Sequence, residues 1–100
     1  MSRYYEMSVR IEGYVPSRRR AIVRAAYDQW SFENFDELPG TPTPTLEGTG
    51  EGNLCGGEGE DRFANRLAKA IRGANGKPCK VVVTATYLED LPSVSYEFDN

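Results

Sequence analysis

Residues 4–14, YYEMSVRIEGY, alternate between apolar and polar side chains along their length. A period of two, with β-branched residues among the apolar ones, is typical of a β-strand that buries one face. The face expected to be buried consists of Tyr5, Met7, Val9 and Ile11. The face expected to be polar consists of Tyr4, Glu6, Ser8, Arg10 and Glu12.

Two later segments have the spacing of amphipathic helices. The first covers 17–29, with Ser17 as the expected N-cap. Its apolar stripe is Ile22, Val23, Ala26 and Trp30. The second covers 58–74, and Gly76 is suited to end it in the left-handed conformation. Its stripe is Phe63, Leu67, Ala70, Ile71 and Ala74.

Three further segments read as strands. A short edge strand is expected near 30–35, followed by a loop, because the prolines of 41–45 cannot donate ladder hydrogen bonds. Residues 45–54 alternate again, with glycines at 48, 50 and 52 on the apolar face, where we expect a helix backbone to approach closely. Residues 79–88 form the next strand, and 90–100 form either an edge strand or a docking arm.

The element order is therefore β-α-β-β-α-β plus a tail. This order predicts an α+β fold, a ferredoxin-like βαββαβ sandwich whose antiparallel sheet carries both helices on one face. A chain of 100 residues makes one domain, 1–100. No apolar run is long enough for a membrane helix, and the first residues lack the apolar stretch of a signal peptide, so we expect a cytoplasmic protein.

The segment LCGGEGEDRF, 54–63, raises the possibility of a phosphate-binding loop before a helix. The expected helix start carries Glu58, Glu60 and Asp61, which would repel a phosphate but suit the helix dipole. Neither GxxxxGK[ST] nor GxGxxG is present. The glycines are therefore predicted to turn the chain into the helix, without a nucleotide.

Residue types needed for common active sites are scarce. The chain has no histidine, which removes the commonest general base and the commonest metal ligand. Its only cysteines, Cys55 and Cys79, cannot supply a four-ligand zinc site. In the predicted topology they lie at opposite ends of the sheet, so they should not form a disulfide. We expect no cofactor, no metal and no enzymatic activity.

Three surface features are candidates for binding. The basic cluster, Arg18, Arg19, Arg20 and Arg24, is either a solvated helix start or a contact to nucleic acid or an acidic protein. The stretch WSFENFDEL places Trp30, Phe32 and Phe35 among acids, either as an interface anchor or as a cap on the core. The predicted polar sheet face lacks the central aromatic residues with which RNA-recognition motifs stack bases, since Tyr4 and Tyr14 lie only at strand ends.

Two stretches carry a resemblance at the level of a protein class. YYEMSVRIEGY and LCGGEGEDRFANRLAKAIRGANGKPCKVVVTATYLEDLP resemble small phage and prophage proteins of unassigned role. Such proteins are often inhibitors of host defence, including anti-CRISPR proteins, which are small, frequently acidic and act by binding. The resemblance implies a binding protein of mobile-element origin and assigns no role to individual residues.

The first hypothesis is a non-enzymatic inhibitor that binds a basic surface of a host protein or ribonucleoprotein, such as a CRISPR effector. Its acidic surface would consist of Glu6, Glu12, Asp36, Glu37, Glu47 and Glu51. The alternatives are a small nucleic-acid binder that uses the basic cluster and a phage assembly protein that self-associates through edge strands or its tail. The net charge of −3 argues against direct binding of nucleic acid.

The acidic helix start and the missing histidines predict that the chain binds neither nucleotides nor zinc. Isothermal titration calorimetry with ATP, GTP and zinc should give no saturable heat. A saturable micromolar site for any of the three would contradict this prediction.

Overall fold

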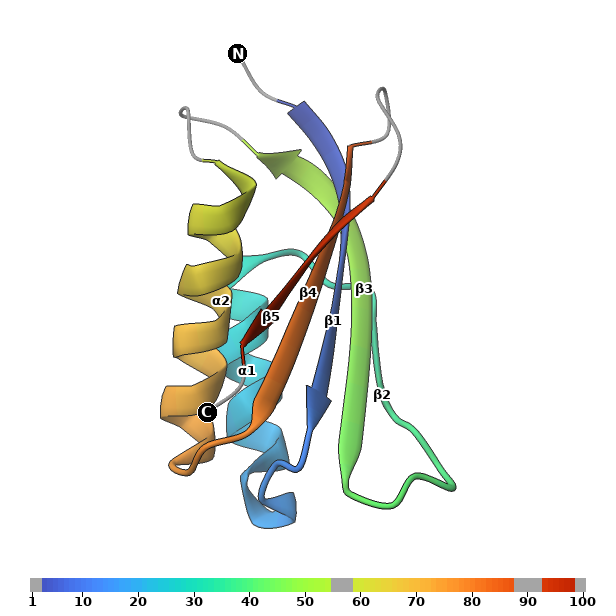
Figure 1. Cartoon of the computed structure of the whole chain (residues 1–100), viewed down its shortest axis with the longest axis vertical. Helices are drawn as coiled ribbons and strands as arrows, with labels where there is room; N and C mark the ends of the chain where they lie inside the picture. The colour runs from blue at the N-terminus through green and yellow to red at the C-terminus, as the bar shows by residue number, and fades with distance from the viewer. Residues whose placement is uncertain (1–2, 55–58, 88–92, 99–100) are drawn as a thin grey trace.

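Five strands pair into one antiparallel sheet in the computed structural model, which describes residues 3–54, 59–87 and 93–98 (Figure 1). The strands are β1 (Arg3–Glu12), β2 (Asn34–Glu37), β3 (Thr45–Leu54), β4 (Lys80–Tyr87) and β5 (Val94–Phe98). The helices are α1 (Arg19–Gln29), preceded by the 3₁₀ turn η1 (Pro16–Arg18), and α2 (Glu60–Asn75). The described chain is therefore an α+β protein with a five-stranded antiparallel sheet.

The strand order is β2-β3-β1-β4-β5. β2 and β3 form the expected hairpin, and β1 lies between β3 and β4. The fifth strand, which pairs with β4, distinguishes this sheet from the four-stranded sheet of a simple βαββαβ chain. Of the two readings of the tail, the described part, 94–98, adopts the edge strand.

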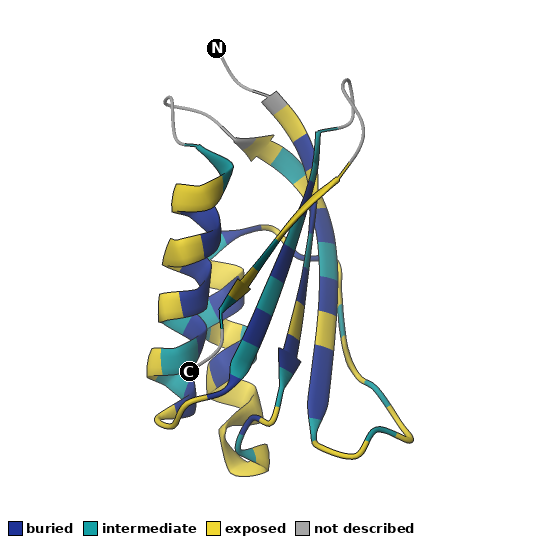
Figure 2. Ribbon diagram, viewed as in Figure 1, coloured by how far each residue is buried: buried dark blue, intermediate teal, exposed yellow. Residues whose placement is uncertain are grey.

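The predicted alternation of β1 is confirmed. Its apolar residues are at most 1 % exposed, and the same sheet face continues through Val81 and Val83 of β4 (Figure 2). These side chains form one core with buried residues of both helices, including Ile22 and Phe63. α1 and α2 pack side by side along the sheet.

The helix boundaries differ from the sequence prediction at both N-termini. Ser17 does not cap α1, because Pro16–Arg18 first forms a 3₁₀ turn and Arg18 takes the N-cap position without a side-chain hydrogen bond. α2 begins at Glu60 after Gly59, while residues 55–58 lie outside the described residues. The predicted end of α2 is confirmed, since Gly76 has φ +74°.

The three glycines on the inner face of β3, hereafter the glycine strip (Gly48, Gly50 and Gly52), make room for the chain that follows α1. A Cβ built on Gly50 would lie 2.3 Å from the carbonyl oxygen of Ser31, and one on Gly48 would lie 2.5 Å from the ring of Phe35. The expectation of a closely packed helix backbone was therefore wrong. The strip accommodates the irregular segment 30–32 and a ring from β2.

This packing also explains why the edge strand expected near 30–35 forms instead at Asn34–Glu37. Trp30 and Phe32 are buried, and the Trp30 indole N–H donates to the carbonyl oxygen of Gly50 at 2.9 Å. Residues 30–32 thus lie over the inner face of β3, and pairing begins only at Asn34. The Trp30 and Phe63 rings lie 5.0 Å apart, so these aromatics belong to the core and are not exposed interface anchors.

Glu60, at the N-terminus of α2, is hydrogen-bonded to two strands of the sheet, β1 and β5. Its carboxylate accepts hydrogen bonds from the hydroxyl of Tyr5 on β1 and, at 3.2 Å, from that of Tyr96 on β5. Tyr5 also stacks on Tyr87 with ring centroids 5.1 Å apart. An acid at this helix start therefore has a structural role in addition to its favourable interaction with the helix dipole.

Two further predictions concern the cysteines and membrane spans. Cys79 is a buried free thiol, and burial raises its pKa although Arg72 opposes the shift. Cys55 lies outside the described residues, so the prediction that it forms no disulfide with Cys79 stays a prediction. Neither helix of the described chain has the length and hydrophobicity that a transmembrane helix requires.

Replacement of Gly50 by alanine tests the glycine strip. Because the new Cβ would meet backbone atoms of Ser31 and Phe32, G50A should lower the free energy of unfolding by about 2–3 kcal/mol. A Cβ added to Gly73 on α2 would meet no atom within 4 Å, so G73A should raise stability by about 0.5–1 kcal/mol. Urea denaturation of both variants measures the difference, and equal stabilities would contradict this packing.

Candidate functional site

The polar face of the sheet, hereafter the open face, is formed by alternate residues of the strands. Register places five transverse rows on it, and its side chains are exposed or half-buried apart from Thr45, which is buried. The open face includes the side chains of Tyr4, Glu6, Ser8, Arg10, Glu12, Asp36, Glu47, Thr49, Glu51, Lys80, Thr84, Ser95 and Glu97. The alternation of β1 and β3 therefore creates this face as predicted.

Two pairs of carboxylates lie directly opposite each other on adjacent strands of the open face. Glu6 of β1 pairs in register with Glu51 of β3, and Asp36 of β2 pairs with Glu47 of β3. Like charges at directly opposite positions destabilise a sheet. The open face therefore carries a concentration of negative charge that costs folding free energy.

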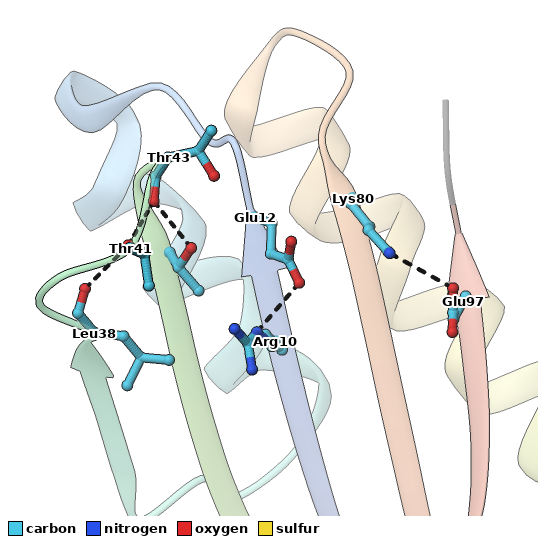
Figure 3. A network of polar contacts seen from close by, with 8 residues as sticks. Arg10, Glu12, Leu38, Thr41, Thr43, Lys80 and Glu97 are labelled. Atoms are coloured by element: carbon cyan, nitrogen blue, oxygen red, sulfur yellow. Dashed lines mark hydrogen bonds and ion pairs between the residues drawn. The ribbon is translucent and has the colours of Figure 1, made fainter.

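The remaining charged groups neutralise only part of this charge. Arg10 pairs with Glu12 at 3.2 Å and Lys80 with Glu97 at 3.7 Å, as Figure 3 shows. Arg10 also lies directly opposite Glu47 in register, but its guanidinium bonds to Glu12. Within the described chain, the side chains of Glu6, Asp36 and Glu47 make no hydrogen bond or ion pair.

Glu51 has a different partner, the hydroxyl of Tyr4, which donates to it at 3.0 Å. This hydrogen bond is the main reason that the pKa of Tyr4 is raised, with lesser contributions from desolvation and from nearby carboxylates. The phenol therefore remains a protonated donor at neutral pH. One neutral hydrogen bond leaves the negative charge of Glu51 in place.

Glu37 does not belong to the open face, which corrects the predicted acidic set. Its register partner is Leu46, a buried residue, so its side chain lies on the helix side of the sheet. There it accepts hydrogen bonds from Tyr14 at 2.9 Å and from Arg19 at 3.3 Å. Burial, followed by this hydrogen bond, raises the pKa of Tyr14. Adjacent residues on a strand point to opposite faces, which separates Glu37 from Asp36.

Small hydroxyl side chains occupy the central row of the open face. Thr49, Ser8, Thr84 and Ser95 are consecutive register partners across four strands. The hydroxyls of Thr84 and Ser95 lie 3.0 Å apart. This row contains no aromatic ring on which a base could stack.

The basic cluster is divided by the structure. Arg18 lies in η1, and Arg19 is the partner of Glu37. Arg20 and Arg24 are exposed on α1, and their side chains have no hydrogen-bond or ion-pair partner in the described chain. Arg24 therefore forms no ion pair with Asp28, which lies one turn further along α1.

The glycine-rich segment adds no ligand-binding geometry to the described residues. Glu58 and Gly56–Gly57 lie outside them, and Glu60 is occupied by two tyrosine hydroxyls. Residues 3–54, 59–87 and 93–98 contain no group of three or more His, Cys, Asp or Glu side chains arranged to hold a metal ion.

Comparison of the chain with protein-family models, curated proteins and solved structures gives no significant match.

Neutralising one member of a carboxylate pair tests whether repulsion on the open face lowers the free energy of unfolding. E6Q removes the repulsion between Glu6 and Glu51, so it should raise the free energy of unfolding by about 0.2–1 kcal/mol. The gain should shrink at high ionic strength because salt screens exposed charges. The matched control is E12Q, which removes a carboxylate already paired with Arg10 and should not stabilise. Equal effects of E6Q and E12Q in urea denaturation would contradict the repulsion.

Proposed function

We propose that this chain is a non-enzymatic, protein-binding inhibitor of mobile-element origin that acts in the host cytoplasm. Its target would be a basic surface of a host nucleic-acid-processing complex of the CRISPR-effector type. Support for the target class comes from the resemblance to small phage and prophage proteins. Support for the mode of binding comes from the charges of the open face.

The observation that carries the binding mode is the pairing of unneutralised carboxylates, Glu6 with Glu51 and Asp36 with Glu47. A partner that places lysines or arginines over these pairs would neutralise repulsion that the free protein retains. Charge complementarity of this kind accelerates association and favours basic partners. Nucleic acid is itself negatively charged, so an acidic surface of this kind is poorly suited to bind it.

The proposal includes a ferredoxin-like arrangement, with both helices on one face of the sheet. The order β2-β3-β1-β4 and the shared core of the helices and the inner face support it. β5 is then an addition beside β4, and the open face remains available to a partner.

A plasmid-interference assay tests the inhibitor function. Bacteria whose CRISPR effector destroys a targeted plasmid should retain that plasmid when they express the wild-type chain with at least one effector in a panel of types. E47K combined with E51K should abolish protection, because it reverses one acid in each carboxylate pair. Both positions are exposed, so each substitution should change stability by no more than about 0.5 kcal/mol.

The control makes the same change in net charge on the helices. D28K combined with D61K substitutes two exposed acids of α1 and α2 and should protect the plasmid as the wild type does. Protection that survives E47K/E51K would exclude the open face as the interface. Absence of protection by the wild type against every effector would exclude this class of target.

A further inference from the structure

A groove of about 590 Å³ lies between α1 and β2, on the opposite side of the sheet from the carboxylate pairs. We call it the edge groove. Its apolar surface comes from Val23 and Tyr27 of α1, Phe35 of β2 and Leu46 of β3. Tyr27 is 45 % exposed, and its ring lies 6.1 Å from that of Phe35. The edge groove therefore presents an aromatic surface that the core does not cover.

β2 forms one edge of the sheet, so its outer hydrogen-bonding groups face no strand of the described chain. The N–H of Leu38 donates to the carbonyl oxygen of Thr45 at 2.9 Å, directed toward β3. Successive residues of an antiparallel strand direct these groups to opposite sides. Phe35 and Glu37 therefore direct their backbone N–H and C=O groups outward, where an added strand would pair.

The charges along the edge groove are not uniform. The Arg19–Glu37 ion pair places the start of α1 beside the end of β2. The Tyr27–Phe35 contact places the end of α1 beside the start of β2. Toward Glu37 the groove is lined by Arg20 and Arg24, which have no acidic partner in the described chain. The groove is thus cationic at the end near Glu37, and at the other end it is aromatic with one acid, Asp28, beside Tyr27.

We propose that the edge groove binds an extended segment of a partner protein, which adds to β2 as an antiparallel strand. The segment would have the order acidic–basic–apolar. Its acidic residue lies opposite Glu37 and reaches Arg20 and Arg24. The charge of Glu37, unlike that of Asp36, is already paired with a cation, Arg19, which reduces its repulsion of an acid at this position. Its apolar residue lies opposite Phe35 and packs on Tyr27.

The central residue of the segment follows from register. It lies opposite Asp36, whose side chain is on the open face and has no partner in the described chain, so a basic side chain complements it. Asp36 also disfavours a second copy of this chain as the occupant of the edge groove. Antiparallel pairing of two β2 strands through Phe35 and Glu37 would place Asp36 directly opposite its own copy, and like charges at such positions repel.

The test uses a fluorescently labelled peptide of about ten residues with Glu-Lys-Leu at its centre, a length that spans the four residues of β2 with flanks. Fluorescence anisotropy should give saturable binding to the full chain. The scrambled peptide, with Lys-Glu-Leu at its centre, has the same composition and should bind at least about tenfold more weakly, a difference of about 1.4 kcal/mol. In a heteronuclear NMR titration, the amides of Phe35 and Glu37 should shift.

Two further controls separate side-chain and backbone recognition. R20E combined with R24E should abolish binding, whereas R62E on the exposed surface of α2 should not alter it. N-methylation of the peptide residues that face β2 should abolish binding, whereas methylation of the intervening residue should not. Equal binding of the scrambled peptide, insensitivity to R20E/R24E, or a dimer that forms through β2 in sedimentation would each overturn the proposal. The peptide contacts Asp36 of the open face, but neither the peptide nor these variants involve Glu47 or the Glu6–Glu51 pair, so failure of this test and failure of the proposed inhibitor function are distinguishable.

Discussion

The contact between the glycine strip of β3 and the segment that follows α1 determines how the rest of the sheet is arranged. Because Gly50 has no side chain, Ser31 and Phe32 lie directly against its backbone and the Trp30 indole reaches its carbonyl oxygen. The chain therefore crosses the inner side of β3 before it returns as β2. Without this close approach β2 could not reach the far edge of β3, and the edge groove between β2 and α1 would not exist.

The sequence predicted the elements that depend on local periodicity. The strand at 45–54 has the expected bounds, and the inner residues of β1, such as Met7 and Val9, are buried as expected. It did not predict the role of residues 30–32, because the close packing of a coil segment on glycines depends on tertiary contacts that no local pattern records. Ser17 failed as a cap for a local reason, because Pro16–Arg18 forms a 3₁₀ turn and the α-helix starts two residues later than expected, at Arg19.

In the candidate site, too, the features set by local periodicity were predicted and those set by tertiary packing were not. Strand alternation was sufficient to place Glu6, Glu47 and Glu51 on one face, but the assignment of Glu37 required knowledge of where β2 begins. A shift of one residue in a strand exchanges its two faces. The direct opposition of Glu6 and Glu51 could not be predicted from the sequence either, because β1 and β3 are distant along the chain and their register is set by packing of the core.

The central position of β1 has a consequence for the order in which the chain folds. β1 precedes the other strands in the sequence, yet its neighbours are β3 and β4, and the latter starts only at Lys80. A nascent chain emerging from the ribosome therefore exposes the apolar side of β1 until most of the domain has been synthesised. Such long-range pairing slows folding, so the core should close only once β4 has emerged from the ribosome.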